Sequence, residues 1–221
     1  MERHFHKDLE ELKQEIFKMG ALVEEMIAKA VTSLFKRDRN LAKQVFEDEK
    51  TINQLEIRID EKGHGLLALD QPMAADMRMI TAILKMNTDL ERMGDHAINI
   101  AERALILCDE PPFETDLSLA EMADVTRKML KDALISFIKG DTELARDVLK
   151  RDDLVDDFND RLYAKVQSLM EKDPLIVKTG MKLVRISHDL ERIADLANNI
   201  AEDAVYMKQG KEVRHRIELE S

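Results

Sequence analysis

Two stretches of the chain, DLERMGDHAINIAER at 89–103 and DLERIADLANNIAED at 189–203, spell nearly the same helix twice. Each copy keeps two acids four residues apart, which are Glu91 and Asp95 in the first copy. Residues at this spacing share one face of a helix, so their carboxylates repel each other at a small energetic cost. Because the costly pair is repeated, we expect a counter-charge to be bound beside it.

The repeat extends beyond these two stretches. FKRDRNLAKQVFEDEKTINQL in the first half matches FIKGDTELARDVLKRDDLVDD in the second half at an offset of 103 residues, and the acidic pairs match at an offset of 100. Breakers divide each half into three helical segments. We expect helices at about 9–35, 41–69, 74–108, 119–140 and 142–170, and a sixth after Pro174. This layout predicts an all-α protein made of two tandem antiparallel three-helix bundles related by a pseudo-twofold axis.

The bundle limits follow from turn and capping signals. CDEPPFETD carries two adjacent prolines among acids and is the best linker, so we assign a first bundle to 1–110, a linker to 111–116 and a second bundle to 117–221. Ser118 and Glu121 have the spacing of a capping box at the start of the fourth helix. Asp141, after Gly140, is the expected N-cap of the fifth helix.

Composition excludes several classes of protein. With 44% hydrophobic and 36% charged residues the chain has the composition of a folded protein, and seven glycines, four prolines and no tryptophan are typical of helices. The net charge of −11 argues against nucleic acid or an anionic membrane as the main partner. Cys108 is the sole cysteine, which fits a reducing cytoplasm. The sequence shows neither a secretory leader nor a run of about 18 apolar residues, so we expect a cytoplasmic protein.

The second helix of each half carries a polar row that can face the acidic pair. The row is Glu49, Asn53, Glu56 and Asp60 in the first half, and Asp152, Asp156 and Asn159 in the second. Facing rows would bring several carboxylates and an amide oxygen together in each half. Oxygen-only clusters suit Mg²⁺, Ca²⁺, Mn²⁺ or iron better than zinc or copper.

The acids have two other interpretations. They can form surface ion pairs with Arg92 and Arg192, in which case the chain is a metal-free helical adaptor. They can belong to a carboxylate-bridged di-metal oxidoreductase, although such sites add a repeated Glu-x-x-His that this chain lacks. His96 and His188 have no counterpart in the other half, and we expect packed or solvated side chains there. No arrangement of residues typical of a catalytic site is present, so we expect no enzymatic activity.

The doubled layout, the two motifs quoted above and their partners EDEKTINQLE and RDDLVDDFND resemble the PhoU family of phosphate-signalling regulators over nearly the whole chain, from about Phe5 to Gln209. The resemblance implies a cytoplasmic, non-enzymatic negative regulator of phosphate uptake and of the phosphate-starvation response. Its implied partners are the ATPase side of the phosphate ABC transporter and a phosphate sensor histidine kinase. These proteins would hold it at the inner face of the membrane.

The resemblance also implies two metal centres. Carried onto this sequence, their ligands are Glu49, Asn53, Glu91 and Asp95 in the first centre, and Asp152, Asp156, Glu191 and Asp195 in the second. Iron is the first expectation, in multinuclear clusters, with magnesium, manganese or zinc as other ions, and we expect a homodimer or higher oligomer. The chain departs from the family pattern at Asn53, where the motif has Asp, and at Ala194, where the first half has Gly94.

Overall fold

Six long α-helices make up the fold in the computed structural model, which describes residues 2–69, 72–112 and 118–209. The helices are α1 (Glu2–Lys36), α2 (Arg39–Leu69), α3 (Ala74–Leu107), α4 (Leu119–Lys139), α5 (Thr142–Lys172) and α6 (Val177–Gln209), and the 3-10 turn η1 (Pro174–Ile176) precedes α6. The described residues form no strand, so the predicted all-α class is confirmed.

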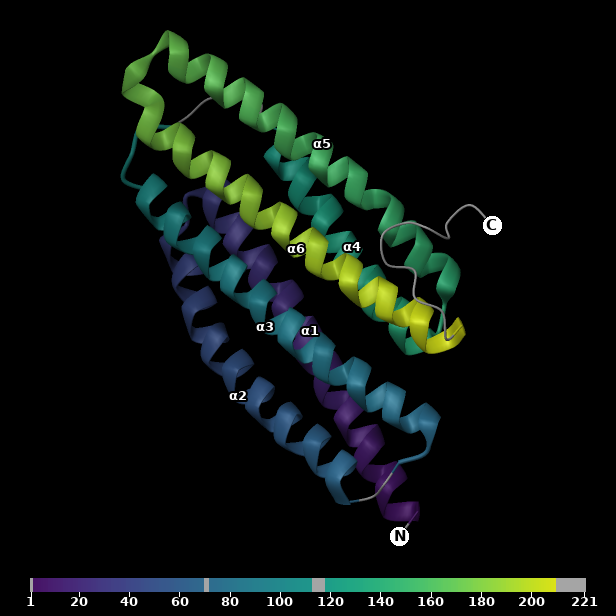
Figure 1. The fold of residues 1–221 in the computed structure, drawn as a ribbon. Helices are drawn as coiled ribbons and strands as arrows, with labels where there is room; N and C mark the ends of the chain where they lie inside the picture. Colours follow the sequence, from purple (N-terminus) through teal and green to yellow (C-terminus); the bar gives the residue numbers. More distant parts are fainter. Residues whose placement is uncertain (1, 70–71, 113–117, 210–221) are drawn as a thin grey trace.

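The helices pack as two antiparallel bundles of three. α1, α2 and α3 pack against one another, and α4, α5 and α6 do the same. The bundles lie side by side with α3 and α6 running antiparallel between them, and α1 contacts α4 behind that pair (Figure 1). We call the contact between α3 and α6 the seam. The predicted pair of tandem bundles is confirmed.

The first turn of each bundle uses the same local chemistry. Arg37 after α1 and Gly140 after α4 both have left-handed backbones, with φ of 53° and 62°. The next residue is an aspartate in both turns, and it caps the second helix of its bundle: Asp38 Oδ1 accepts from the backbone N–H of Asn40 at 2.8 Å, and Asp141 Oδ1 accepts from that of Leu144 at 3.1 Å. The predicted cap at Asp141 is confirmed.

One predicted helix start and one predicted helix cap are wrong. α1 begins at Glu2 rather than near Leu9, because Phe5 continues the buried apolar stripe of α1 by one turn and is only 7% exposed. Ser118 lies at the N-cap position of α4, but its backbone is left-handed, with φ of 53°, and its side chain makes no capping hydrogen bond. The capping box predicted from Ser118 and Glu121 is therefore absent at this helix end.

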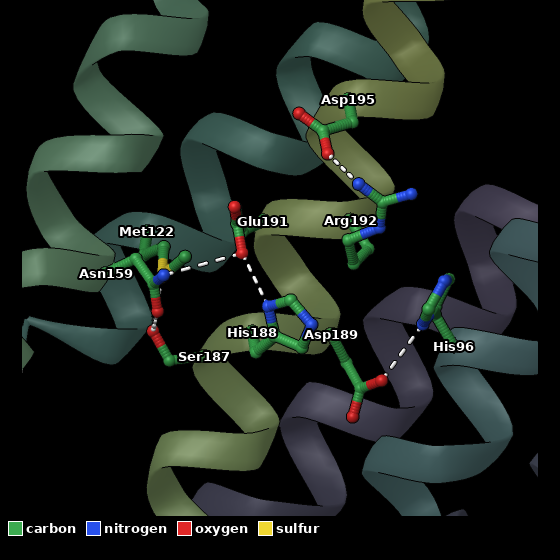
Figure 2. Close-up of polar contacts among 9 residues, drawn as sticks. All are labelled: His96, Met122, Asn159, Ser187, His188, Asp189, Glu191, Arg192 and Asp195. Carbon is green, nitrogen blue, oxygen red and sulfur yellow. Dashed lines mark hydrogen bonds and ion pairs between the residues drawn. The ribbon is translucent and has the colours of Figure 1, made fainter. Parts of the chain in front are cut away.

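One end of the seam is held by a buried carboxylate. Asp189 of α6 is 5% exposed. Its Oδ2 accepts from Arg103 Nη1 of α3 at 2.7 Å, and its Oδ1 lies 2.9 Å from His96 Nδ1, also of α3 (Figure 2). A buried carboxylate is tolerated only when charged or hydrogen-bonding groups replace its water. Arg103 and His96 supply those groups, so this end of the seam is an ion-paired contact.

The other end of the seam carries the equivalent residues with a different charge pattern. Asp89 of α3 occupies the place of Asp189, and Asp203 of α6 occupies the place of Arg103. Burial and the neighbouring Asp203 raise the pKa of Asp89 from 3.8 to about 6, with partial compensation from Arg92 and from a hydrogen bond with Asn199. Lys85 Nζ lies 3.3 Å from Asp203 Oδ1. This end of the seam therefore brings two carboxyl groups together.

A polar anchor joins the end of α3 to the start of α6. Glu110 Oε2 accepts from Thr179 Oγ1 at 2.7 Å, and Glu110 Oε1 accepts from Lys182 Nζ at 2.6 Å. Arg37 donates to the backbone carbonyls of Cys108 and Glu110. The linker predicted at 111–116 follows at once, and its part from 113 onward lies outside the described residues.

The helices are amphipathic along their whole length. In the described ranges none contains an uninterrupted apolar segment long enough to cross a lipid bilayer.

Candidate metal centres

Close helix packing brings each acidic pair against its polar row. At Gly63 of α2 an added Cβ would lie 2.6 Å from Leu84 Cδ2 of α3, and at Gly180 of α6 it would lie 2.8 Å from Val166 Cγ1 of α5. A larger residue at either place would force the neighbouring side chain to shift. Both glycines lie on the helix pairs that carry the predicted ligands.

In the first bundle, Glu91 of α3 lies among other acids. Its side chain is half-buried, and burial is the main cause that raises its pKa above the ordinary value. The carboxylates of Asp95, Glu56 and Glu49 raise this pKa further, while Arg92 lowers it. Glu49 and Glu56 belong to α2, so the polar row faces the acidic pair, as the sequence predicts.

Asn53 is the fourth predicted ligand of this centre. It lies on α2 one turn after Glu49 and is exposed. The structure thus brings Glu49, Glu91 and Asp95 into electrostatic reach of one another and places Asn53 beside them on the row.

In the second bundle, the acidic pair of α6 makes direct polar contacts. Glu191 Oε2 accepts from Asn159 Nδ2 of α5 at 3.4 Å and lies 2.6 Å from His188 Nδ1 (Figure 2). Asp195 Oδ2 accepts from Arg192 Nη1 at 2.6 Å. Burial raises the pKa of Asp195, and Arg192 opposes that rise. Here the carboxylates are partly neutralised by residues of their own helix.

The remaining predicted ligands of this centre come from α5. Asp152 is half-buried and Asp156 is exposed, and both lie on α5, which packs along α6. The position of Asn159 on the same row, in contact with Glu191, shows that this row faces the acidic pair. Both halves therefore place the predicted ligands on facing helices.

The surface ion pairs weighed as an alternative occur in one half. Arg192 pairs with Asp195 at 2.6 Å, whereas among the described residues no ion pair joins Arg92 to Asp95. The pairing in the second half accounts for part of that acidic face. It does not account for the first half, where Glu91 lies close to the acids of α2.

The donor set suits a hard cation, although the side chains as they stand do not surround one. Within 2–69, 72–112 and 118–209, no group of three or more His, Cys, Asp or Glu side chains is arranged to hold a metal ion. A cation would therefore need rotamer changes, which exposed side chains make within nanoseconds. Burial is the main cause that raises the pKa values of Glu91 and Asp195, and a bound divalent cation would lower both.

Three further residues lie near the acidic pairs. The predicted polar rows include Glu56 and Asn159, but neither is a predicted ligand, because the motif of the family ends one turn earlier. His188 is exposed, as expected, and it also contacts Glu191 (Figure 2). Its spacing of three residues before Glu191 on one helix was the available signal.

The departure at Ala194 has a simple structural meaning. A Cβ added at its counterpart Gly94 would meet Ile52 Cγ2 at 3.8 Å and Met26 Cε at 3.9 Å, which are ordinary van der Waals distances. Alanine therefore fits at both positions. The difference between Gly94 and Ala194 does not distinguish the two centres.

The structure thus belongs to the class of helical proteins that consist of two similar three-helix bundles. In each bundle the third helix carries an acidic pair. The chain belongs to the PhoU family: the family model described as the PhoU domain matches it twice, at residues 16–104 and 119–204. The resemblance drawn from the sequence motifs is thereby confirmed.

Relatives match over nearly the full length. A protein of Aquifex aeolicus described as a phosphate-specific transport system accessory protein PhoU homolog is 42% identical over 210 residues, which are 95% of each chain. A Pseudomonas putida protein of the same description is 37% identical over 96% of this chain and 84% of its own.

Solved structures show the same fold. The crystal structure of PhoU from Pseudomonas aeruginosa has a TM-score of 0.91 and 36% identity, and it covers 94% of this chain and 100% of that one. The PhoU structure from Streptococcus pneumoniae, titled a phosphate transport system regulatory protein, has a TM-score of 0.86 and 32% identity over 95% of this chain and 99% of that one.

Proposed function

We propose that this chain is an accessory protein of a phosphate-specific transport system, acting as a negative regulator of phosphate uptake and of the phosphate-starvation response. The observation that carries the proposal is the match to relatives of that description over 95% of both chains. The matched residues include both bundles and both acidic pairs. A regulator needs surfaces rather than a reaction centre, and we assign no catalytic residue.

The partners in this proposal are the ATPase side of the phosphate ABC transporter and a phosphate sensor histidine kinase. α2, α3, α6 and α5 form one broad layer that carries both candidate centres, and α1 and α4 lie behind it (Figure 1). A long layer of this kind offers two separate areas for two partners. The proposal places the protein in the cytoplasm, at the inner face of the membrane through those partners, as a homodimer or higher oligomer.

The proposal also assigns metal ions, iron first, to the two acidic centres. Facing carboxylates with raised pKa values support it. A bound divalent cation would supply positive charge and hold α2 to α3 and α5 to α6. What this chain contributes is a set of oxygen donors on adjacent helices, whose mutual repulsion is relieved by the cation.

Regulation is tested by deletion in the bacterium that carries this chain. In phosphate-rich medium, the deletion strain should express a phosphate-starvation reporter that the wild type keeps silent, and the gene on a plasmid should restore silence. A reporter that stays silent in the deletion strain would contradict negative regulation. Affinity purification of the tagged chain under the same conditions should retain the transporter ATPase.

Metal binding is tested separately by elemental mass spectrometry of protein purified without chelator. The wild type should carry stoichiometric metal, and the variant Glu91→Ala, Asp95→Ala, Glu191→Ala, Asp195→Ala should lose it while circular dichroism shows unchanged helicity. Equal metal in both proteins would overturn these sites. No metal in either protein, even after reconstitution, would favour a metal-free helical adaptor whose acids act through surface charge.

A further inference from the structure

The two polar rows exchange an acid and an amide between equivalent positions. The first row has Asn53 followed by Glu56, whereas the second row has Asp156 followed by Asn159 at the matching places. Each row therefore carries one acid and one amide at this pair of positions. The first centre lacks a carboxylate only if position 56 takes no part in it.

Contacts with the third helix place position 56 beside the acidic pair. Asn87 of α3, one turn before Glu91, donates from Nδ2 to the backbone carbonyl of Glu56 at 3.0 Å. This bond holds the backbone of Glu56 against α3, one turn from Glu91. The side chain of Glu56 is half-buried.

The second bundle shows how far a side chain at this position reaches. Asn159, the counterpart of Glu56, lies 3.4 Å from the Glu191 carboxylate through its Nδ2. Its Oδ1 accepts from Ser187 Oγ at 2.7 Å, and Ser187 is fully buried (Figure 2). Because Ser187 occupies the oxygen of this amide, the NH₂ group points at Glu191, and an NH₂ group cannot bind a cation.

We propose that Glu56 is a ligand of the first metal centre, supplying the carboxylate that Asn53 lacks, and that Asn159 instead positions Glu191 in the second. Each centre then has four carboxylates, which are Glu49, Glu56, Glu91 and Asp95 in the first and Asp152, Asp156, Glu191 and Asp195 in the second. This inference rests on the metal binding proposed above.

The test isolates the first centre and exchanges its acid and amide. In a full-length background carrying Glu191→Ala and Asp195→Ala, Mn²⁺ is titrated and free Mn²⁺ is counted by electron paramagnetic resonance. Glu56→Gln should weaken Mn²⁺ binding by about tenfold or more, in the range found when groups around a metal are removed. The double change Asn53→Asp, Glu56→Asn copies the second row and should restore binding to within about threefold of the background, because charge count sets affinity in oxygen sites.

A matched control and a reference variant separate the outcomes. Glu61→Gln removes the same charge from an exposed position of α2 outside the row and should leave binding unchanged. Glu91→Ala with Asp95→Ala should abolish binding in this background. If that pair abolishes binding while Glu56→Gln leaves it intact, the role of Glu56 is overturned and the metal centre stands. If Mn²⁺ fails to bind even the background protein, the first metal centre is overturned, and the role of Glu56 with it, whereas the elemental analysis of the wild type still decides the metal function.

Discussion

The two ends of the seam start from the same repeated sequence and differ in charge. At one end Asp189 is paired with Arg103 and His96, and at the other end its counterpart Asp89 lies near Asp203. The difference comes from two positions of the repeat, because Arg103 and His96 of α3 correspond to Asp203 and Leu196 of α6. A duplicated fold can therefore keep its packing while one half of an interface changes from attraction to repulsion.

Removing the buried carboxylate should have the largest effect. Asp189→Ala leaves Arg103 and His96 facing each other across the seam without their shared partner. We expect the free energy of unfolding, measured by urea denaturation at neutral pH, to fall by about 2 to 4 kcal/mol. Asp109→Ala, which breaks the exposed pair with Arg39, is the control and should cost less than about 1 kcal/mol. A similar small loss for Asp189→Ala would show that the buried pair does not hold the bundles together.

The repulsive end should make stability depend on pH in the opposite sense from an ion-paired acid. The pKa of Asp89 is raised to about 6 in the folded protein, so between about pH 4 and pH 6 the native state binds more protons there than the unfolded chain. Stability from this group is therefore present at low pH and lost as the pH rises through 6. Because the carboxyl is only half-buried, we expect a loss of about 1 to 2 kcal/mol.

Other carboxyl groups titrate in the same pH range. The effect of Asp89 is therefore measured as the difference in stability between the wild type and Asp89→Asn. Urea denaturation of metal-free wild type and Asp89→Asn, at several pH values from about 4 to 7, gives the difference between them. The variant should gain stability relative to the wild type as the pH rises. A difference that stays constant with pH would mean that Asp89 has an ordinary pKa.

The smallest expected effect comes from making the two ends alike. Asp203→Arg copies Arg103 into α6, which replaces the repulsion with Asp89 by an attraction but costs the contact with Lys85. We expect a net gain of about 1 kcal/mol in the free energy of unfolding at pH 7. Asp203→Asn removes the repulsion and the charge that pairs with Lys85, without adding an attraction, and should gain about half as much. A loss of stability in both variants would show that Asp203 contributes more through its own contacts than it costs at Asp89.

The fold could be predicted from sequence because the repeat and the breakers are local signals. Asp141 follows Gly140 and caps α5, as its sequence context predicts. Ser118 has an equally good capping spacing, yet the left-handed backbone at this residue turns its side chain away from the role. A capping motif indicates which residue can cap a helix. The backbone conformation of that residue decides whether it does.

The candidate centres were predictable only in part. The rows could be found from helical periodicity, and the acidic pairs from repetition. The contacts of His188 with Glu191, and of Ser187 with Asn159, depend on rotamers and on the distance between α5 and α6, which no local pattern specifies. The unequal ends of the seam were also visible as Arg103 and Asp203 in the repeated stretches. Whether Arg103 and Asp203 attract or repel their neighbours depends on which residues α3 and α6 bring together.

The order of the helices along the chain has a consequence for how the protein reaches this structure. Each bundle is formed by consecutive helices, whereas the contacts of the seam join residues 86 and 118 positions apart, as in Arg103 with Asp189 and Lys85 with Asp203. Contacts between near neighbours in sequence form fastest, and domains fold as units during synthesis. The first bundle therefore folds before the second is complete, and the seam closes last. Substitutions of the charged residues at the seam should accordingly change the rate of unfolding. The rate at which each bundle folds should stay almost the same.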